Sequence, residues 1–466
     1  MERLRPLILL LFVLLMVNGG LRAQVVKESD SIPEIPTFTD TVGIDAPFID
    51  LSTLDTLPVM PVVTDTVVVD TIVADDLYEP DETSIQFEID TLYWGGDSYY
   101  KNHFINKIRD VMENKRGNIR ILHIGGSHVQ AGTMTHRIRK HLLDEYGGAP
   151  AARGFIFPYS AANKCNNPND YRISKKENFN LIRNVYKDHT FPLGASGIAV
   201  WNADQMNSLT VTMNAPGYDF MADTIVLLGE PHGWPIDPIL KEDTIYHFPD
   251  SIDLQNGRYY FYFDRPVRDF TFYFPCSKGD TFVVNGILLQ NERPGITLSS
   301  IGVNGAQTGS YLRCRNFTRD MQLLQPDLVI FGIGVNDAYG NSFDSVAFKN
   351  NYLELVRRIR SVNPDCAFIF FSNNDTWKAG RKGRYYVNMT GPSVAEVMYR
   401  LADLTGSAVW DQFAIMGGLK SMETWRKKGL AQKDRVHFTA SGYNLIGDLF
   451  FNALIRDLKT EGDEHR

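Results

Sequence analysis

Two parts of the chain, 93–190 and 295–466, show a regular change in the spacing of their apolar residues. Short apolar runs, typical of strands buried on both faces, alternate with stretches in which apolar residues recur every three to four positions, as on one face of a helix. This alternation predicts a parallel sheet covered by helices on both faces. The predicted strands are 119–124, 327–332, 367–372 and 409–411, and the predicted helices are 99–115, 133–146, 345–361, 393–405 and 440–458.

The intervening segment, residues 191–294, has a different pattern. Aromatic and β-branched residues dominate it, and the runs 258–263, 270–274 and 282–289 are typical of strands. Asn285-Gly286 lies between apolar residues and predicts a hairpin turn. We therefore expect a small antiparallel β-sandwich inserted into the α/β domain, which a fold tolerates when the two ends of the insertion lie close together.

The amino-terminal residues predict export. In residues 1–23, Arg3 and Arg5 precede an apolar run over 7–17, and Leu-Arg-Ala ends the segment, as in a secretory signal peptide. The run is short for a membrane span, so an uncleaved anchor is the less favoured alternative. No later stretch is long and apolar enough to cross a bilayer. We expect an exported protein, periplasmic or extracellular, without a transmembrane segment after cleavage.

Residues 24–92 are predicted to be an acidic low-complexity linker. Asp-Thr motifs and prolines recur, and few aromatic residues are available for a core. The segment serves either as a tether or as a passive spacer. The whole chain has a net charge of −8, but residues 24–95 contain sixteen Asp or Glu and one Lys, so the part that follows is mildly basic. It has no concentrated basic stripe, which argues against a nucleic-acid partner.

The cysteines and histidines predict no metal site. The four cysteines are scattered without a C-x-x-C pair, which gives no support to a zinc or redox centre. Cys276 and Cys314 are able to pair in an oxidising compartment, whereas Cys366 opens an apolar run and is expected in the core.

Ser127 is the candidate nucleophile. It follows Gly125-Gly126 at the carboxyl end of a predicted strand and precedes a predicted helix. Glycines permit a sharp turn that presents the hydroxyl, and this edge of an α/β sheet is where ligands bind. A serine after two glycines is otherwise an ordinary turn residue, so Ser127 needs a base elsewhere in the chain to act as a nucleophile.

His437 is the candidate base. It precedes the last predicted helix, and Asp434 lies three positions earlier, where a carboxylate is able to accept the imidazole Nδ1 proton. The plain alternative is a solvated loop before a helix, although Thr439 or Ser441 already supplies a helix cap. His128, next to Ser127, is expected to be structural or to contact the substrate. His123, in the predicted strand, is expected to be a core residue.

Two further motifs offer hydrogen-bond donors for a developing oxyanion. Asn336, in Gly-Val-Asn-Asp after a predicted strand, carries an amide group, and Gly305 offers a backbone N–H unobstructed by a side chain. Each is also a common loop residue, so neither identifies a site alone.

In this order along the chain, the four motifs resemble the sequence blocks of the SGNH (GDSL-type) hydrolases. The resemblance covers 93–190 and 295–458 and implies a flavodoxin-like three-layer α/β/α fold. It implies Ser127 as nucleophile, His437 as base and Asp434 as its partner. It further implies an oxyanion hole formed by the N–H groups of Ser127 and Gly305 and by Asn336, with no metal ion or organic cofactor.

Two longer segments, Ile-Gly-Gly-Ser-His-Val-Gln-Ala-Gly from Ile124 and Gly-Val-Asn-Gly-Ala from Gly302, resemble bacterial peptidoglycan O-acetylesterases of this family. Those proteins carry a carbohydrate-binding-like β-domain between the Ser and Gly blocks, and 178 positions separate Ser127 from Gly305 here. The resemblance implies a serine esterase acting on O-acetyl groups of a glycan such as peptidoglycan. The partner is then an acetylated glycan or another small acyl ester.

Gly126 departs from the family pattern, which usually has Asp at this position to brace the loops around the site. The departure leaves the three candidate residues intact and is expected to loosen the nucleophile turn. Three alternatives stay open. The first is an acetyltransferase that uses the same three residues, and the second is a lipid esterase. The third is a glycan-binding protein that has an SGNH scaffold but no catalytic activity.

Overall fold

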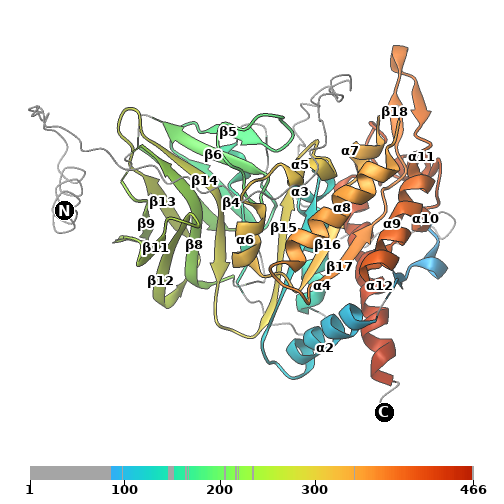
Figure 1. Cartoon of the computed structure of the whole chain (residues 1–466), viewed down its shortest axis with the longest axis horizontal. Coiled ribbons are helices and arrows are strands. Elements are labelled where there is room, and N and C mark those ends of the chain that lie inside the picture. Colours follow the sequence, from blue (N-terminus) through green and yellow to red (C-terminus); the bar gives the residue numbers. More distant parts are fainter. Residues whose placement is uncertain are drawn as a thin grey trace, which may run out of the picture. The chain divides into compact units, whose positions relative to one another are not determined.

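The computed structural model describes residues 85–463, except residues 97, 145–151, 163–164, 166, 204–205, 216–217, 219, 234–235 and 341. The predicted signal peptide, 1–23, and the predicted linker up to residue 84 lie outside the described residues. The described residues form an α/β part and two antiparallel sheets (Figure 1). Their buried apolar side chains make one continuous core.

The α/β part is built on a six-stranded sheet. Its strand order is β1-β20-β17-β16-β2-β15, and the edge strand β1 runs antiparallel to the parallel strands beside it. The four strands predicted from apolar runs are confirmed, and β1 and β15 are additions. The bounds are β1 Leu92–Trp94, β2 Asn118–Gly125, β15 Gly295–Gly302, β16 Leu328–Gly332, β17 Ala367–Phe371 and β20 Ala408–Trp410.

Helices cover both faces of this sheet. Neighbouring residues of β17 point to opposite faces. The Phe370 ring packs on Tyr352 of α8 at 5.4 Å between centroids, and the Phe371 ring packs on Phe450 of α12 at 4.7 Å. The predicted three-layer α/β/α arrangement is therefore confirmed. The main helices are α2 Tyr99–Glu113, α4 Thr133–Asp144, α8 Ser345–Arg360, α9 Gly391–Thr405 and α12 Ala440–Asp463.

The two antiparallel sheets form the predicted β-sandwich insertion. Aromatic side chains join them, since Phe261 packs on Phe272 and Phe282 packs on Phe274 with centroids 5.5 and 5.4 Å apart. One sheet has the order β10-β9-β13-β7-β4 and the other β11-β12-β8-β14-β6-β5, with β3 also paired to β14. The strands β3, β4 and β5 belong to these sheets, although they precede residue 191. The boundary of the insertion at 190/191 stays a prediction. The bounds are β3 Gly154–Ile156, β4 Tyr171–Lys175, β5 Asn180–Arg183, β6 Ile198–Ala203, β7 Asn207–Met213, β8 Ala222–His232, β9 Ile239–Glu242, β10 Ile245–His247, β11 Ser251–Asp253, β12 Arg258–Val267, β13 Phe270–Phe274 and β14 Thr281–Gln290.

The hairpin turn predicted at Asn285-Gly286 is wrong. Both residues lie inside the single strand β14, where the pairing with β8 shifts register between Val284 and Gly286. Gly286 has a φ of 156°, and a Cβ atom there would lie 2.2 Å from the Phe155 ring. The Asn-Gly pair therefore makes a β-bulge at which β14 exchanges one neighbour, β6, for another, β3.

The pairing considered for Cys276 and Cys314 is also wrong, because neither cysteine forms a disulfide in the described part of the chain. Cys314 is fully buried and its thiol contacts the Ser310 carbonyl oxygen. The prediction that Cys366 belongs to the core is confirmed, since it is fully buried at the start of β17. Among the described residues, no helix combines the length and the apolarity that a membrane span needs.

Candidate active site

The candidate nucleophile lies on a tight turn between β2 and the short helix α3, Ser127–Gln130. Gly125 ends β2, and a Cβ atom there would lie 2.6 Å from the Gly332 carbonyl oxygen, so only glycine fits. The Tyr311 hydroxyl donates to the Gly125 carbonyl oxygen at 2.8 Å, and this hydrogen bond fixes the position of the turn. Ser127 is thus the first residue of α3, where backbone N–H groups have no partner within the helix.

Three predicted residues meet although 310 positions separate the outer two. The Ser127 Oγ atom lies 2.8 Å from His437 Nε2, and His437 Nδ1 lies 2.7 Å from Asp434 Oδ2. Asp434 Oδ1 accepts the backbone N–H groups of Val436 and His437 at 2.9 and 3.0 Å. In this arrangement Nε2 is positioned to accept the hydroxyl proton while the carboxylate holds the other ring N–H.

The surroundings keep Asp434 ionised. Burial raises its pKa, but the hydrogen bond and charge of His437 and the two backbone N–H donors outweigh burial and bring the pKa below its ordinary value. An ionised carboxylate at this position stabilises an imidazolium ring at His437. Arg435 bends the loop with a left-handed backbone, φ 59°, and its guanidinium pairs with Glu423 at 2.7 Å.

The predicted Gly305 block reaches the site because β15 and β2 are parallel neighbours. Their register places Gly302 opposite Gly125, so the segments that follow the two strands leave the same edge side by side. The Asn304 N–H donates to Gln130 Oε1 of α3 at 2.8 Å and ties the two segments together. Gly305 itself has a φ of 83°, a conformation that favours glycine.

Asn336 approaches the same turn from the next strand. It lies in the short helix α7, Val335–Ala338, which follows β16. A Cβ atom built on Gly126 would lie 3.6 Å from Asn336 Nδ2 and 3.7 Å from the Ala306 carbonyl oxygen. The same Nδ2 donates to that carbonyl at 3.0 Å. One N–H of the amide is thereby anchored, and the other stays available beside the nucleophile turn.

A second set of hydrogen bonds, which the sequence did not identify, fixes the two donor segments. Gln307 Nε2 donates to the Asn336 carbonyl oxygen at 3.1 Å, and the Thr308 hydroxyl donates to the Asp337 carboxyl at 2.6 Å. Burial raises the pKa of Asp337 to about 7, despite the hydrogen bonds from Thr308. The sequence feature that could have indicated this contact is Asp337, the last residue of the Gly-Val-Asn-Asp motif.

Two histidines near the site are structural, as expected. The His128 ring lies 5.1 Å from the His437 ring and its Nδ1 hydrogen-bonds the Tyr443 hydroxyl at 3.0 Å. Burial, and then the neighbouring His437, lower the pKa of His128 to about 3. His123 lies in the core of β2, where Nδ1 pairs with Thr135 Oγ1 at 2.9 Å and burial lowers its pKa to about 3. Both rings therefore hold a proton only weakly, which makes them poor bases compared with an ordinary histidine.

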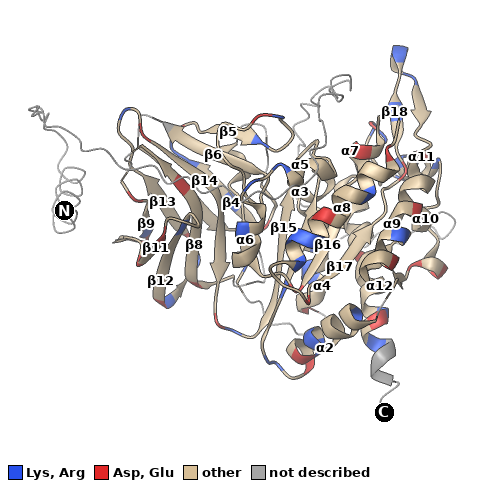
Figure 2. Ribbon diagram, viewed as in Figure 1, with Lys and Arg blue, Asp and Glu red and all other residues tan. Residues whose placement is uncertain are grey.

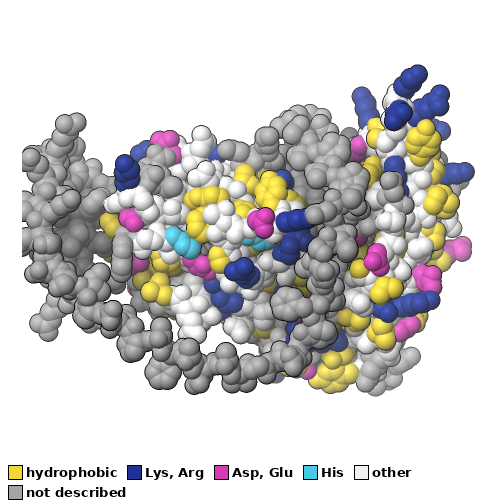
Figure 3. Space-filling model, turned by 45° about the horizontal axis from the view of Figure 1, so that its top comes forward, with side chains coloured by type: hydrophobic (Ala, Val, Ile, Leu, Met, Phe, Trp, Pro, Cys, Tyr) yellow, Lys and Arg dark blue, Asp and Glu magenta, His cyan; other side chains and the backbone are white. Residues whose placement is uncertain are grey.

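A basic hairpin, β18 Trp377–Ala379 and β19 Tyr385–Val387, rises beside the loop that carries His437. Figure 2 shows Lys and Arg at its tip, and Figure 3 shows the same cations together with hydrophobic side chains at the surface. Over the described ranges, no cluster of His, Cys, Asp or Glu is suited to hold a metal ion.

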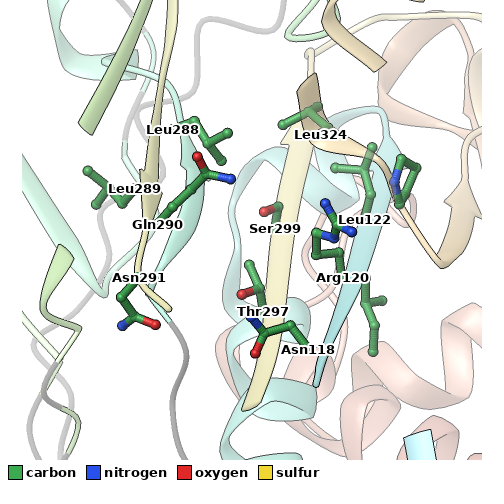
Figure 4. Close-up of a pocket in the computed structure, with 12 residues that line it drawn as sticks. Asn118, Arg120, Leu122, Leu288, Leu289, Gln290, Asn291, Thr297, Ser299 and Leu324 are labelled. Carbon is green, nitrogen blue, oxygen red and sulfur yellow. The ribbon is translucent and has the colours of Figure 1, made fainter. Parts of the chain in front are cut away.

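A cavity of about 200 Å³ lies away from this site, between β14 and the strands β2 and β15 (Figure 4). Gln290 of β14 lies on one side of it, and Ser299 of β15 and Arg120 of β2 lie on the other. Residues from the amino-terminal part of β2 line it, whereas Ser127 follows the carboxyl end of that strand. The cavity is therefore separate from the candidate site.

Residues 283–445 match the GDSL-like lipase/acylhydrolase family. A peptidoglycan O-acetylesterase structure is similar with a TM-score of 0.65 and 22% identity, over 79% of this chain and 99% of that one. A lipase/acylhydrolase from Enterococcus faecalis has a TM-score of 0.27 and 20% identity, over 34% of this chain and 76% of its own. A family two carbohydrate esterase from Cellvibrio japonicus has a TM-score of 0.25 and 10% identity, over 61% and 98%. No curated protein sequence matches the chain.

The matched segment contains the Gly305, Asn336 and Asp434–His437 blocks, and the Ser127 block precedes the inserted sheets. The likeness covers 79% of this chain, which is more than the α/β part alone, so it extends into the antiparallel sheets. Residues 283–445 thus match the GDSL-like lipase/acylhydrolase family, and the fold is similar to that of a peptidoglycan O-acetylesterase structure.

Proposed function

We propose that this chain is an exported serine esterase that removes O-acetyl groups from a glycan such as peptidoglycan. The observation that carries the proposal is the hydrogen-bonded series from Ser127 Oγ through His437 to Asp434, at 2.8 and 2.7 Å. A serine hydroxyl is a weak nucleophile until a base takes its proton, and here the base and its carboxylate are in contact with it.

The proposed reaction has two halves. Ser127 Oγ attacks the acetyl carbonyl carbon while its proton passes to His437 Nε2, and the oxyanion accepts hydrogen bonds from the N–H groups of Ser127 and Gly305 and from Asn336. The intermediate collapses as His437 returns the proton to the departing sugar oxygen. Water, deprotonated by His437, then attacks the acetyl-serine, and acetate leaves as Ser127 regains its proton. Asp434 stabilises the imidazolium in both halves.

The choice of substrate and compartment has separate support. The similar structure with the TM-score of 0.65 is a peptidoglycan O-acetylesterase, and the likeness covers 79% of this chain. Residues 1–23 have the sequence pattern of a secretory signal peptide, which agrees with a substrate outside the cytoplasm. The inserted β-sandwich is proposed to contact the glycan, in line with the resemblance to carbohydrate-binding modules.

The test uses residues 24–466 with 4-nitrophenyl acetate and with O-acetylated peptidoglycan, and measures released acetate. Ser127→Ala is expected to lower kcat by about a thousandfold or more. Ser361→Ala, which changes an exposed serine at the end of α8, is the matched control and should retain activity. Undiminished hydrolysis by folded Ser127→Ala would overturn the assignment. Acetyl groups recovered on an added sugar, in place of free acetate, would identify a transferase.

A further inference from the structure

The hairpin β18–β19 is strongly cationic. It carries Lys378, Arg381, Lys382 and Arg384, and residues 376–390 contain no Asp or Glu. Arg381, Lys382 and Arg384 are exposed, and none of the four cations forms an ion pair with another described residue. The three exposed charges on this short two-stranded hairpin repel one another, and no described carboxylate pairs with them. Their arrangement therefore calls for an anionic partner.

The base of this hairpin is joined to the His437 loop. The Trp377 N–H donates to the Arg435 carbonyl oxygen at 3.1 Å, and the Arg435 guanidinium lies 4.1 Å from the centre of the Tyr385 ring. Arg435 is flanked by Asp434 and lies two positions before His437 in the sequence. The hairpin and the candidate base thus form one connected unit.

The hairpin is also joined to the segment that carries Asn336. The Tyr339 hydroxyl donates to the Trp377 carbonyl oxygen at 3.1 Å, and Lys378 Nζ donates to the Gly340 carbonyl oxygen at 2.6 Å. Asn388 Nδ2 donates to the carbonyl of Ala338, the last residue of α7, at 3.0 Å. The cationic tip is thereby held at the rim of the site, within reach of a polymer bound there.

Exposed apolar side chains accompany the cations. Tyr386 is 56% exposed and Met389 is 66% exposed, although both belong to this small structure. On the Gly305 side, a Cβ atom at Gly305 would lie 3.7 Å from Val185, and the adjacent Tyr186 is 46% exposed. Amphipathic rings beside cations suit a chain of sugar rings that bears acid groups.

We propose that the hairpin binds carboxylate groups of the glycan chain whose O-acetyl group reacts at Ser127, so that the preferred substrate is an anionic O-acetylated polysaccharide. The inference rests on the proposed esterase function and adds the charge of the substrate to it. Carboxylates on sugars several units from the ester contact Arg381, Lys382 and Arg384, while the ester itself lies against Ser127. The cations also attract the polymer from solution.

The experiment compares two acetylated polymers that differ in charge. O-acetylated polygalacturonate carries a carboxylate on each sugar, and the same polymer after methyl-esterification is neutral. Acetate release is measured for wild type, for Arg381→Gln/Arg384→Gln, and for Lys115→Gln/Arg116→Gln. The last pair removes the same charge from exposed residues before β2, at the opposite edge of the sheet. 4-Nitrophenyl acetate is the third substrate.

We expect the hairpin variant to lose about tenfold in kcat/KM on the anionic polymer, mainly through KM, as two surface ion contacts allow. Its activity on the neutral polymer and on 4-nitrophenyl acetate should equal that of wild type. Raising the salt concentration should bring the wild type towards the variant, because exposed charges are screened. The control pair should match wild type on all three substrates.

Equal kcat/KM for wild type on the charged and neutral polymers would overturn this inference, and so would an equal loss in the control pair. Either result would leave the esterase proposal intact as long as Ser127-dependent hydrolysis of 4-nitrophenyl acetate persists. Absence of that hydrolysis in wild type would instead contradict the proposed function itself. The two failures are therefore separable.

Discussion

The carboxyl group of Asp337 accepts hydrogen bonds from both the backbone N–H and the hydroxyl of Thr308, at 3.1 and 2.6 Å. Together with the hydrogen bond from Gln307 Nε2 to the Asn336 carbonyl oxygen, this pair joins the helix that carries Asn336 to the loop that carries Gly305. Burial raises the pKa of Asp337 to about 7, which makes the contact sensitive to pH.

Asp337→Asn is expected to become more stable, relative to wild type, as the pH rises. An unfolded Asp ionises near pH 4, whereas folded Asp337 ionises near pH 7, so the folded state holds more protons between these values. Wild-type stability contributed by this group therefore falls as the pH rises from about 4 to 7 and stays low above 7. Asn is neutral throughout. Thermal unfolding at pH 4.5 and 8 measures the difference, and a constant difference would contradict it.

Asn336→Ala is expected to lower kcat by about a hundredfold to a thousandfold with little change in KM, as is usual on removing one oxyanion donor. Gln307→Ala is the matched control, because it removes a hydrogen bond to Asn336 from the same network without removing a donor to the substrate. The control should lose less than about tenfold. Similar losses in both variants would indicate that Asn336 acts through the loop conformation alone.

Gly126→Asp is expected to fold normally and to change kcat by less than about tenfold. Gly126 has φ −96°, a conformation open to other residues, and an added Cβ atom meets its neighbours at 3.6 Å or more. The N–H groups of Val129 and Gln130 already bind its carbonyl oxygen, so the turn is formed without a carboxylate brace. A gain near a hundredfold, the size expected from correcting a misplacement of about an ångström, would show that the native turn is loose.

The sequence predicted the layers and the three residues of the Ser-His-Asp series because each has a local signature. Apolar runs mark buried parallel strands. Ser127 follows a predicted strand and His437 precedes a predicted helix, both at the edge of the sheet where ligands bind. The contact of Thr308 with Asp337 has no such signature. It depends on the parallel registers of β15 and β16 with β2, the strand between them, and register is a property of the assembled sheet.

The wrong hairpin at Asn285-Gly286 has a related cause. Local sequence predicts a turn, but β14 pairs with β8 through both apolar runs, and only a bulge at Gly286 interrupts the pairing. The close approach of Phe155, from a strand about 130 positions away, selects glycine there. The tertiary contact with Phe155 therefore determines the backbone conformation at Gly286, although the Asn-Gly dipeptide alone predicts a turn.

Asp170→Asn is expected to destabilise the protein by about 3–5 kcal/mol, the usual result of leaving buried charges without a partner. The Asp170 carboxylate binds Arg139 of α4 at 2.8 Å and Arg153, next to β3, at 2.5 Å, and all three residues are at most 3% exposed. Glu396→Gln is the control, because its pair with Arg400 lies on the surface of α9 and should contribute less than about 1 kcal/mol. Urea unfolding of both variants at pH 7 measures the two effects.

The difference between Asp170→Asn and wild type should shrink in acid. Burial raises the pKa of Asp170, but Arg153 and Arg139 outweigh it and bring the pKa well below its ordinary value. The unfolded carboxyl titrates near pH 4, so the stability that ionised Asp170 contributes is complete above pH 4 and is lost as the pH falls below it. Asn lacks this loss, and the two unfolding midpoints should converge below pH 4. Parallel midpoints down to pH 3 would mean that the carboxylate contributes through packing, and that its charge is not what holds α4 to the inserted sheets.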